Sequence, residues 1–446
     1  MKKIMVLIIV TFIITNLTWA KEPGDYEKYW PQWRGPYATG VSLYGNPPLE
    51  WNETKNLKWK IELPGKGHAT PIIWGNRVFI STAVETGKEG KPKEQGDGRQ
   101  RSHSWMQPTI TSKIHKFVVL SIDRQNGKIL WQRTVNEEWP EEERSHGLGS
   151  WASSSPVTDG KHVYAYFGSR GLYCLDMKGN LKWKRDFGQM DKRMTFGEGS
   201  SPALYGDKIV VLWDHEGQSF LFALDKKTGK DAWKVERDEV TSWSTPLILE
   251  YKGKPQVITS ATKFVRSYDL TTGKLLWKCT GLTYNVIPHP MAADGIVYVA
   301  SGFRGSAFFA VRLAGAKGDI TGTDGIAWKL DKNTPYTPSM VLYQNILYML
   351  KSNSGILSCY DAGNGKEHYS KQRLEGVGNI YASPVGAKDR IYFIGHKGTM
   401  YVIKHGTKFE ILAKNTLDDT FNASPAIVGN EIYLRGYKNL YCIVNK

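Results

Sequence analysis

Cysteine is scarce in this sequence, and its placement excludes several kinds of site. The 446 residues contain four cysteines, at positions 174, 279, 359 and 442. No two of them are adjacent or spaced as CxxC, and no CxxCH haem-attachment motif occurs. An exported protein can form disulfides, but these spacings do not resemble a disulfide framework. Because three of the four occupy one position of the repeat described below, we expect buried thiols.

Common catalytic and nucleotide-binding motifs are also missing. The ten histidines include no HExxH pattern, and neither a GxSxG elbow nor a phosphate-binding GxxxxGK[ST] loop is present. No run of five or more basic residues marks a nucleic-acid-binding tail. We therefore expect no metal site, no catalytic residues of these classes and no nucleic-acid partner.

Long apolar runs are confined to the N-terminus. Lys2 and Lys3 precede an apolar stretch at 4–14, and Ala20 supplies a small residue for cleavage. This order is typical of a secretory signal peptide, which we place at 1–20. The run is shorter than the roughly 20 residues of a transmembrane helix. We expect an exported protein, periplasmic or extracellular, that does not span the membrane.

Charge of one sign is in excess. Lys and Arg number 59 against 43 acidic residues, a formal net charge of +16. Such an excess favours acidic partners or surfaces through long-range attraction. The equally good alternative is that these charges only keep the surface solvated.

An internal repeat dominates the rest of the chain. In a typical copy a small or polar residue and a proline precede two apolar strands. A third strand follows and ends near an Asp, and a Gly-Lys turn and a Trp come after it. Successive prolines of the repeat are 41 to 48 residues apart, except for a first interval of 85. They are Pro71, Pro156, Pro202, Pro246, Pro290, Pro338, Pro384 and Pro425. Period-2 alternation with turns every 8 to 12 residues indicates strands. Four-stranded units repeated in this way predict an all-β, eight-bladed β-propeller over 57–446, with a mobile insertion at 84–115 in the first blade.

The ends of the chain indicate how this ring closes. Only 21 residues follow Pro425, which is enough for three strands of a four-stranded antiparallel blade. Residues 57–64 contain a blade-ending Trp59 with no blade before it. We predict that this N-terminal strand completes the last blade and removes an open sheet edge. Residues 21–56 are left as an N-terminal extension.

One tryptophan recurs at the same position of the repeat. We interpret these side chains as packing between adjacent blades rather than as a ligand platform. They are Trp59, Trp131, Trp183, Trp233, Trp277 and Trp328.

The segments at 122–131 (IDRQNGKILW), 224–233 (LDKKTGKDAW) and 268–277 (YDLTTGKLLW) resemble the PQQ-like (pyrroloquinoline quinone) repeat. The opening at 30–42 (WPQWRGPYATGVS) resembles exported bacterial PQQ-binding-like propeller proteins. The overall organisation is similar to the propeller lipoproteins of the outer-membrane β-barrel assembly machinery. The resemblance implies a propeller fold and leaves the activity open.

Within the family that the chain resembles, dehydrogenases hold the quinone and Ca²⁺ on the propeller axis. Glu198, Asn285, Arg304 and Trp243 are candidates for such a site here. Those enzymes also carry a disulfide between adjacent cysteines beside the quinone, which this sequence lacks. We expect a non-catalytic scaffold without a cofactor, and a PQQ-dependent dehydrogenase with quinone and Ca²⁺ remains the alternative.

Strand order predicts which face binds. In an antiparallel blade with strands A to D, the B–C turns and the links from D to the next A leave from one face, here called the mouth face. Loops on a rigid scaffold commonly carry binding residues, and aromatic residues with arginine anchor interfaces. The candidates are His68, Trp151, Arg170, Glu198, Trp243, Lys263, Asn285, His289, Arg304, Tyr336, Tyr381 and Phe421. The expected partner is an envelope protein, a peptide or an anionic glycan; the alternative is that the aromatic residues only fill the mouth.

Overall fold

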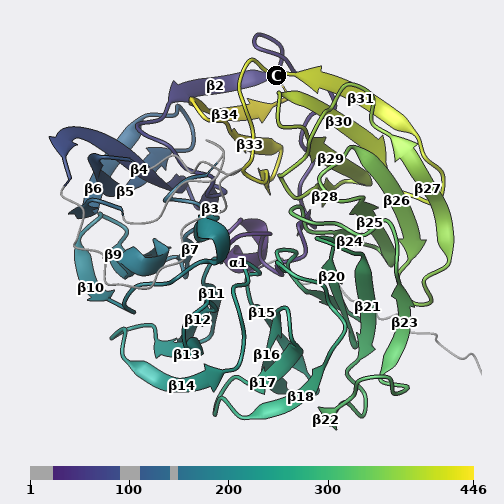
Figure 1. Cartoon of the computed structure of the whole chain (residues 1–446). Coiled ribbons are helices and arrows are strands. Elements are labelled where there is room, and N and C mark those ends of the chain that lie inside the picture. Colours follow the sequence, from purple (N-terminus) through teal and green to yellow (C-terminus); the bar gives the residue numbers. More distant parts are fainter. Residues whose placement is uncertain (1–23, 91–110, 141–148, 446) are drawn as a thin grey trace, which may run out of the picture.

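The computed structural model describes residues 24–90, 111–140 and 149–445. Eight antiparallel four-stranded sheets stand side by side in a ring around a central axis (Figure 1). The predicted eight-bladed propeller is confirmed. The proposed signal peptide at 1–20 and most of the insertion at 84–115 lie outside the described residues.

Blades 1 to 4 follow one another along the chain. Blade 1 contains β3 (Ile72–Trp74), β4 (Arg77–Glu89), β5 (Lys113–Asp123) and β6 (Ile129–Glu138). Blade 2 contains β7 (Val157–Thr158), β8 (His162–Tyr166), β9 (Leu172–Asp176) and β10 (Leu181–Arg185). Blade 3 contains β11 (Ala203–Tyr205), β12 (Lys208–Trp213), β13 (Ser219–Asp225) and β14 (Asp231–Arg237). Blade 4 contains β15 (Leu247–Tyr251), β16 (Lys254–Ser260), β17 (Val265–Asp269) and β18 (Leu275–Cys279), with β22 (Gly318–Asp319) added at its outer edge.

Blades 5 to 8 complete the ring. Blade 5 contains β19 (Met291–Ala293), β20 (Ile296–Ser301), β21 (Ala307–Arg312) and β23 (Ile326–Leu330). Blade 6 contains β24 (Val341–Tyr343), β25 (Ile346–Leu350), β26 (Ile356–Asp361) and β27 (Glu367–Arg373). Blade 7 contains β28 (Val385–Ala387), β29 (Arg390–Ile394), β30 (Thr399–Lys404) and β31 (Ile411–Thr416). Blade 8 contains β32 (Ala426–Val428), β33 (Glu431–Arg435), β34 (Asn439–Val444) and β2 (Leu57–Glu62). Strand β1 (Val41–Ser42) is added in parallel at the inner edge of blade 7. Short elements outside the sheets are α1 (Asp25–Lys28) and 3₁₀ turns at Gly168–Arg170 and Arg193–Thr195.

Burial follows the order of strands within a blade. In blade 3 the second strand, KIVVLW, is buried along almost its whole length, whereas the fourth, DAWKVER, is mostly exposed. The second strand has neighbouring blades on both faces and is rich in β-branched residues, which suits a two-sided buried position. Apolar clusters join adjacent blades; Tyr164 of β8 and Val211 of β12, for example, belong to one cluster. The core therefore lies between the blades.

The N-terminal strand closes the ring as predicted. Strand β2 pairs antiparallel with β34, and Trp59 lies opposite Cys442. Lys58 Nζ lies 2.6 Å from a carboxylate oxygen of Glu431 on β33, the strand beyond β34. Strand β2 and the C-terminal strands β32, β33 and β34 thus share blade 8 (Figure 1).

The repeated tryptophans each contact the next blade. Their indole nitrogens donate at 2.8–3.1 Å to backbone carbonyl oxygens there: Trp59 to Arg124, Trp131 to Met177, Trp183 to Lys226, Trp233 to Leu270, and Trp328 to Ala362. In the same turn a glycine with positive φ packs against the ring, as Gly229 does against Trp183. Trp277 is the exception, because the turn of blade 5 is replaced by 313–325. Its indole nitrogen is buried without a hydrogen-bond partner among the described residues.

Hydroxyl groups link the blades around the axis. Backbone N–H groups donate to the next hydroxyl at 2.8–3.0 Å, from Thr70 to Ser155, Ser155 to Ser201, Ser201 to Thr245, His289 to Ser339, Ser339 to Ser383, and Ser383 to Ser424. In blade 6 the linking hydroxyl belongs to Ser339, so Met340 rather than Pro338 occupies the position of the repeat proline. The sequence-based register of that blade is therefore two residues off, because the Thr-Pro-Ser order places the required hydroxyl after the proline.

The N-terminal extension enters the axis, a role that the sequence did not predict. Helix α1 lies at the centre of the ring in Figure 1. Trp30 forms a bridge with Ile73 of blade 1, and β1 pairs in parallel with β28 of blade 7. The guanidinium of Arg34 is buried and donates to the carbonyl oxygens of Met340, Pro384 and Thr39. The extension therefore ties blades 1, 6 and 7 together from inside.

The strands of blade 1 continue into the predicted insertion. Strands β4 and β5 remain paired as far as Glu89 and Lys113, so 84–89 and 113–115 are strand rather than loop. Thr86 Oγ1 donates to the carbonyl oxygen of Ile114 at 2.8 Å. Because both faces of this end of the hairpin are polar, apolar alternation does not reveal it in the sequence.

The four thiols are buried and unpaired, as expected. Burial raises the pKa of each one to about 12. Within the described ranges, no helix is long and apolar enough to cross a membrane.

Candidate functional site

A pocket of about 420 Å³ lies on the axis at the mouth face. It is bordered by D–A links and by Asn353 of a B–C turn, as strand order predicted. Six rings reach it, those of Trp33, His68, Phe196, Trp243, Tyr336 and Tyr381. Its polar lining includes Glu198, the amides Asn353 and Asn422, and the linking hydroxyls of Ser155, Ser201, Ser383 and Ser424. Each of these hydroxyl oxygens accepts a backbone N–H, which leaves its own O–H available as a donor.

Five of the predicted site residues meet in this pocket: His68, Glu198, Trp243, Tyr336 and Tyr381. They come from different links between blades and converge because each link descends toward the axis. Tyr336 stacks on Phe303 with ring centroids 5.1 Å apart, and His68 stacks on Tyr437 at 5.4 Å. The pocket therefore has an aromatic wall held by further rings.

The other predicted residues lie elsewhere. Asn285 and Phe421 are buried outside the pocket lining. Trp151 borders a small crevice that adjoins the pocket and shares Phe196 and Glu198 with it. Its ring packs against His115, with centroids 4.5 Å apart. Lys263 and Arg304 are exposed side chains that do not line the pocket.

Arg170, expected at an exposed turn, is buried. Its Nε lies 3.0 Å from a carboxylate oxygen of Glu138 in blade 1. Its guanidinium carbon also lies 5.6 Å from the centre of the Phe117 ring. The side chain folds inward because its long aliphatic stem and planar head can cover apolar surface while the charge is paired.

Trp33 of the extension belongs to the pocket and was missed by sequence reasoning. It packs edge-on against the buried His289, with ring centroids 5.5 Å apart, so the predicted His289 lies against it. In the sequence, the opening motif WPQWRGP only resembled that of other propeller proteins, and this resemblance did not place Trp33 in a pocket. No period or spacing in the sequence places residues 30–36 on the axis.

Trp243 is held rigidly at the pocket wall. Its backbone N–H donates to Val286 at 2.9 Å, and its indole nitrogen donates to the carbonyl oxygen of Gly197 at 2.7 Å. Lys192 Nζ donates to the carbonyl oxygens of Asp214 and Ser242, which fixes the residue just before Trp243. An aromatic side chain held in this way loses little entropy when it binds a partner.

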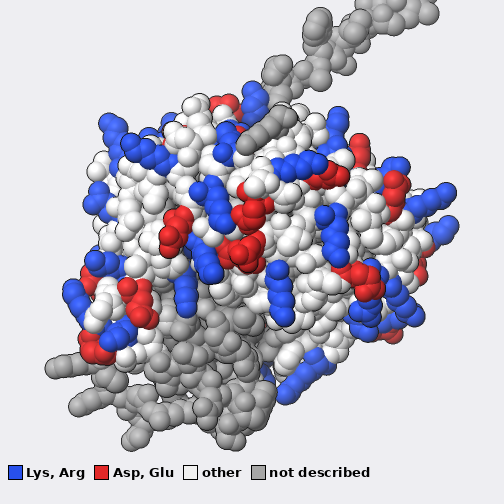
Figure 2. Space-filling model, turned by 90° about the horizontal axis from the view of Figure 1, so that it is seen from above, with Lys and Arg blue, Asp and Glu red and all other residues white. Residues whose placement is uncertain are grey.

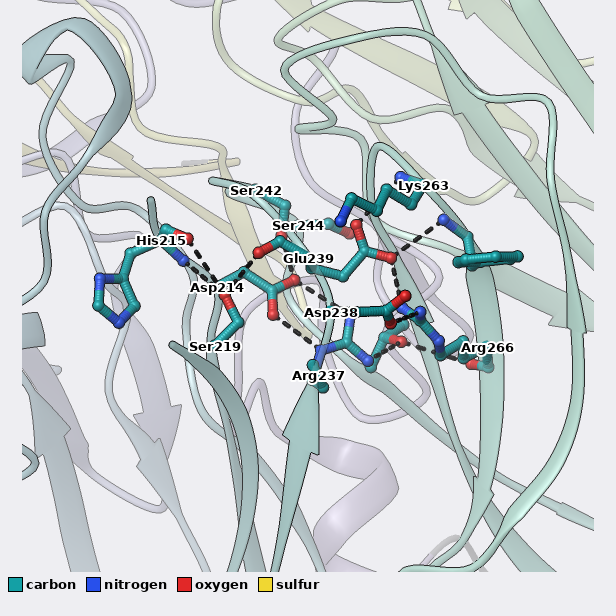
Figure 3. Close-up of polar contacts among 12 residues, drawn as sticks. Asp214, His215, Ser219, Arg237, Asp238, Glu239, Ser242, Ser244, Lys263 and Arg266 are labelled. Carbon is teal, nitrogen blue, oxygen red and sulfur yellow. Dashed lines mark hydrogen bonds and ion pairs between the residues drawn. The ribbon is translucent and has the colours of Figure 1, made fainter. Parts of the chain in front are cut away.

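A buried ion-pair network supports the same link (Figure 3). Asp214 and Arg237 face one another with two contacts, of 2.8 and 3.1 Å, and neither side chain is exposed. Ser242 Oγ donates to Asp214 at 2.8 Å. Glu239 accepts the backbone N–H groups of 263 and 264 and pairs with Arg266. The network joins blades 3 and 4 beneath the mouth face.

The electrostatics of the pocket differ from those of the whole chain. Glu198 is the one carboxylate among the described lining residues, and no Lys or Arg lines the pocket with it. Burial, helped by the nearby Arg435 charge, lowers the pKa of His68 to about 3, so this ring is neutral. The charge of +16 is carried elsewhere; on the side of the ring shown in Figure 2, basic and acidic side chains are interspersed.

Similar proteins fall into two groups. The outer membrane protein assembly factor BamB of Yersinia pestis is 22% identical over 355 residues, covering 69% of this chain and 85% of that protein. The structure of BamB from Moraxella catarrhalis matches with a TM-score of 0.58 at 14% identity, over 87% of this chain and 99% of that one. Quinohemoprotein alcohol dehydrogenase from Comamonas testosteroni matches with a TM-score of 0.64 at 12% identity, over 95% and 82%. At these identities the two structures show the shared fold alone.

A family model gives the assignment. The model described as outer membrane protein assembly factor BamB matches residues 115–280 and 223–444, which is most of the chain. The matched repeats contain all of the repeated tryptophans except Trp59. This chain belongs to the PQQ-like repeat family of β-propellers represented by BamB.

Proposed function

We propose that the protein is an exported, non-catalytic scaffold of the cell envelope that binds another envelope protein at the axial mouth. The observation that carries the proposal is the pocket itself. Several aromatic side chains and a circle of serine hydroxyl donors converge there around the preorganised Trp243. Fixed aromatic side chains in a concave site are typical of residues that dominate protein–protein binding. Membership of a family represented by an outer membrane protein assembly factor supports the same function.

The mouth suits an inserted segment of a protein better than an anionic glycan. Arg170, Lys263 and Arg304, which suggested an anionic partner, do not line the pocket. The rings offer apolar surface, while Asn353, Asn422 and the hydroxyls offer hydrogen bonds to backbone groups. Exposed Lys263 and Arg304 remain on the mouth face, where such charges affect the association rate more than the strength of binding.

The pocket residues do not fit a Ca²⁺-assisted quinone. Ca²⁺ takes six to eight oxygen ligands, and among the described lining residues only Glu198 is a carboxylate. Both of its oxygens already accept hydrogen bonds from Ser169. Asn285, the second candidate ligand, is buried outside the lining. We therefore propose no quinone chemistry for this chain.

Photocrosslinking in cells tests the binding proposal. A photoreactive residue at Tyr336 or Tyr381 should crosslink to one envelope protein, and a matched residue at exposed Leu275 on blade 4 should not. Trp243→Ala should abolish the Tyr381 crosslink while the protein remains folded. Equal crosslinking at Leu275, or crosslinks that survive Trp243→Ala, would place the partner on another surface.

A further inference from the structure

The opposite face of the propeller carries a second and larger cavity. Its volume is about 1340 Å³, and it is bordered by residues of A–B and C–D turns, including Gly206, Gln344 and Lys226. One wall is the N-terminal extension at 36–43, and the other consists of inner strands of blades 3 to 6. Pockets for small ligands usually measure about 300–1,000 Å³. The size of this cavity suits a chain segment better than a single small molecule.

The cavity lies along the open edge of β15. Five consecutive residues, 246–250, border it. Side chains of a strand alternate between two faces, so a cavity against one face would contact every second residue. Contact with all five therefore means that the cavity runs beside the strand edge. Strand β15 is paired only with β16, and its other edge faces the axis.

The protein already uses such an edge once. In blade 7 the inner strand β28 is paired on its axial side with β1, and Val41 lies opposite Gly386. By the repeat, Leu247–Leu249 of blade 4 correspond to Val385–Ala387 of blade 7. An extended segment added to β15 would therefore repeat an arrangement that the fold accommodates. Strand addition of this kind is a common mode of peptide recognition.

Exposed apolar side chains surround the cavity. Leu43 is 57% exposed, Tyr37 46% and Tyr205 37%, and all three border it. They come from both walls, two from the extension and one from blade 3. Exposed apolar residues gathered at a concavity are typical of an interaction site.

The residues that border this cavity include more acidic than basic side chains, although the whole chain is basic. Asp159 is paired with Lys226 at 2.9 Å. The other two carboxylates are held by tyrosine hydroxyls, since Tyr37 donates to Glu27, and Tyr205 donates to Glu250 at 2.7 Å. Among the described residues no Lys or Arg forms an ion pair with Glu27 or Glu250. Both carboxylates remain available to a cationic side chain.

We propose that this cavity binds an extended peptide carrying Lys or Arg between apolar residues, added as a strand to the open edge of β15. The peptide backbone pairs with the strand edge, its apolar side chains pack on Leu43 and Tyr205, and its basic side chains reach Glu27 and Glu250. The site is separate from the axial mouth, because none of its lining residues is shared with the mouth pocket.

Fluorescence anisotropy with a labelled, end-capped peptide, Val-Lys-Leu-Lys-Val-Tyr, tests the proposal. We expect saturable binding at least tenfold tighter than that of the same peptide with Glu in place of Lys. Glu27→Lys and Glu250→Lys should each weaken binding about tenfold, which corresponds to 1.4 kcal/mol. Glu367→Lys, the same change at an exposed position on β27, should have no effect. A probe with N-methylated backbone amides should lose its binding, because it cannot pair with the strand edge.

Several outcomes would overturn the proposal. Equal binding of the Lys and Glu probes would remove the charge argument, and unchanged binding of the N-methylated probe would remove strand addition. Self-association that Glu250→Lys abolishes, measured by sedimentation, would assign the cavity to a second copy of the chain. Trp243→Ala should leave probe binding intact. Failure at this cavity is therefore distinguishable from failure of the proposed mouth function.

Discussion

The indole nitrogen of Trp59 donates a hydrogen bond to the carbonyl oxygen of Arg124 at 3.0 Å. Trp59 lies on the N-terminal strand of blade 8, and Arg124 follows the third strand of blade 1. The contact therefore joins blade 8 to blade 1, and its two residues are 65 apart in the chain because β2 leads directly into blade 1. Arg124 also reaches Glu431, with Nε 2.6 Å from the carboxylate, so a charged pair strengthens the same junction.

Trp59→Ala should lower the free energy of unfolding by about 3–5 kcal/mol, the usual range for removing a large buried aromatic side chain. Chemical denaturation checks this value. Leu130→Ala, at an exposed position of β6, is the control and should change stability little. Identical unfolding curves for Trp59→Ala and the wild-type protein would mean that this junction does not hold the ring.

The repeated tryptophans offer a paired comparison. Trp233→Phe removes a hydrogen bond to Leu270 as well as volume, whereas the indole nitrogen of Trp277 has no described partner to lose. A net hydrogen bond contributes about 1 kcal/mol. We expect Trp233→Phe to lower the free energy of unfolding by about 1 kcal/mol more than Trp277→Phe does, in thermal and chemical unfolding. The reverse order would show that packing alone decides both positions.

The buried pair beneath the mouth should be sensitive to loss of one partner. Asp214→Asn leaves the Arg237 charge without its counterion in a fully buried place, and breaking such a pair costs about 3–5 kcal/mol. At the surface, Asp207→Asn removes only an exposed partner of Lys208 and should cost less than about 1 kcal/mol. Denaturant midpoints distinguish the two. Similar small losses would mean that solvent reaches Arg237.

Acid should destabilise the protein through two histidines on the axis. Burial lowers the pKa of His68 and of His289 to about 3, against 6.5 for an ordinary histidine. Between pH 6.5 and 3 the unfolded chain binds protons that the folded chain does not, so stability falls as the pH falls through this window. His289→Gln should flatten this fall relative to its own stability at pH 7. An unchanged slope for both His289→Gln and His68→Gln would assign the acid sensitivity to other groups.

The sequence predicted the ring because the repeat is local. In most blades the strands, the turn and the tryptophan follow one another within about 45 residues, and the unpaired Trp59 strand implied the closure. The register of blade 6 was missed for a local reason too, since Pro338 stands one residue before the linking Ser339.

The site was only partly predictable. A two-residue alternation shows which face of a strand a side chain occupies, but not how far along the axis that side chain lies. Counting from the repeat prolines brought His68, Trp243 and Tyr381 to the mouth, but could not tell that Phe421 is buried beside Tyr441. Arg170 turned inward because Glu138, a residue of another blade, pairs with it. Trp33 belongs to no repeat, so only the assembled ring reveals that it contributes to the pocket.

The pairing of β2 with β34 also means that the ring cannot close until β34 has been synthesised. Trp59 and its partner Cys442 are 383 residues apart in the chain. At roughly 5–20 residues per second, synthesis of that interval takes about 20–75 s. Throughout this interval β34 does not exist for β2 to pair with, and the blades already made form an open arc with a bare edge at each end. A chain arrested before residue 439 would keep those edges, which are templates for pairing with other chains.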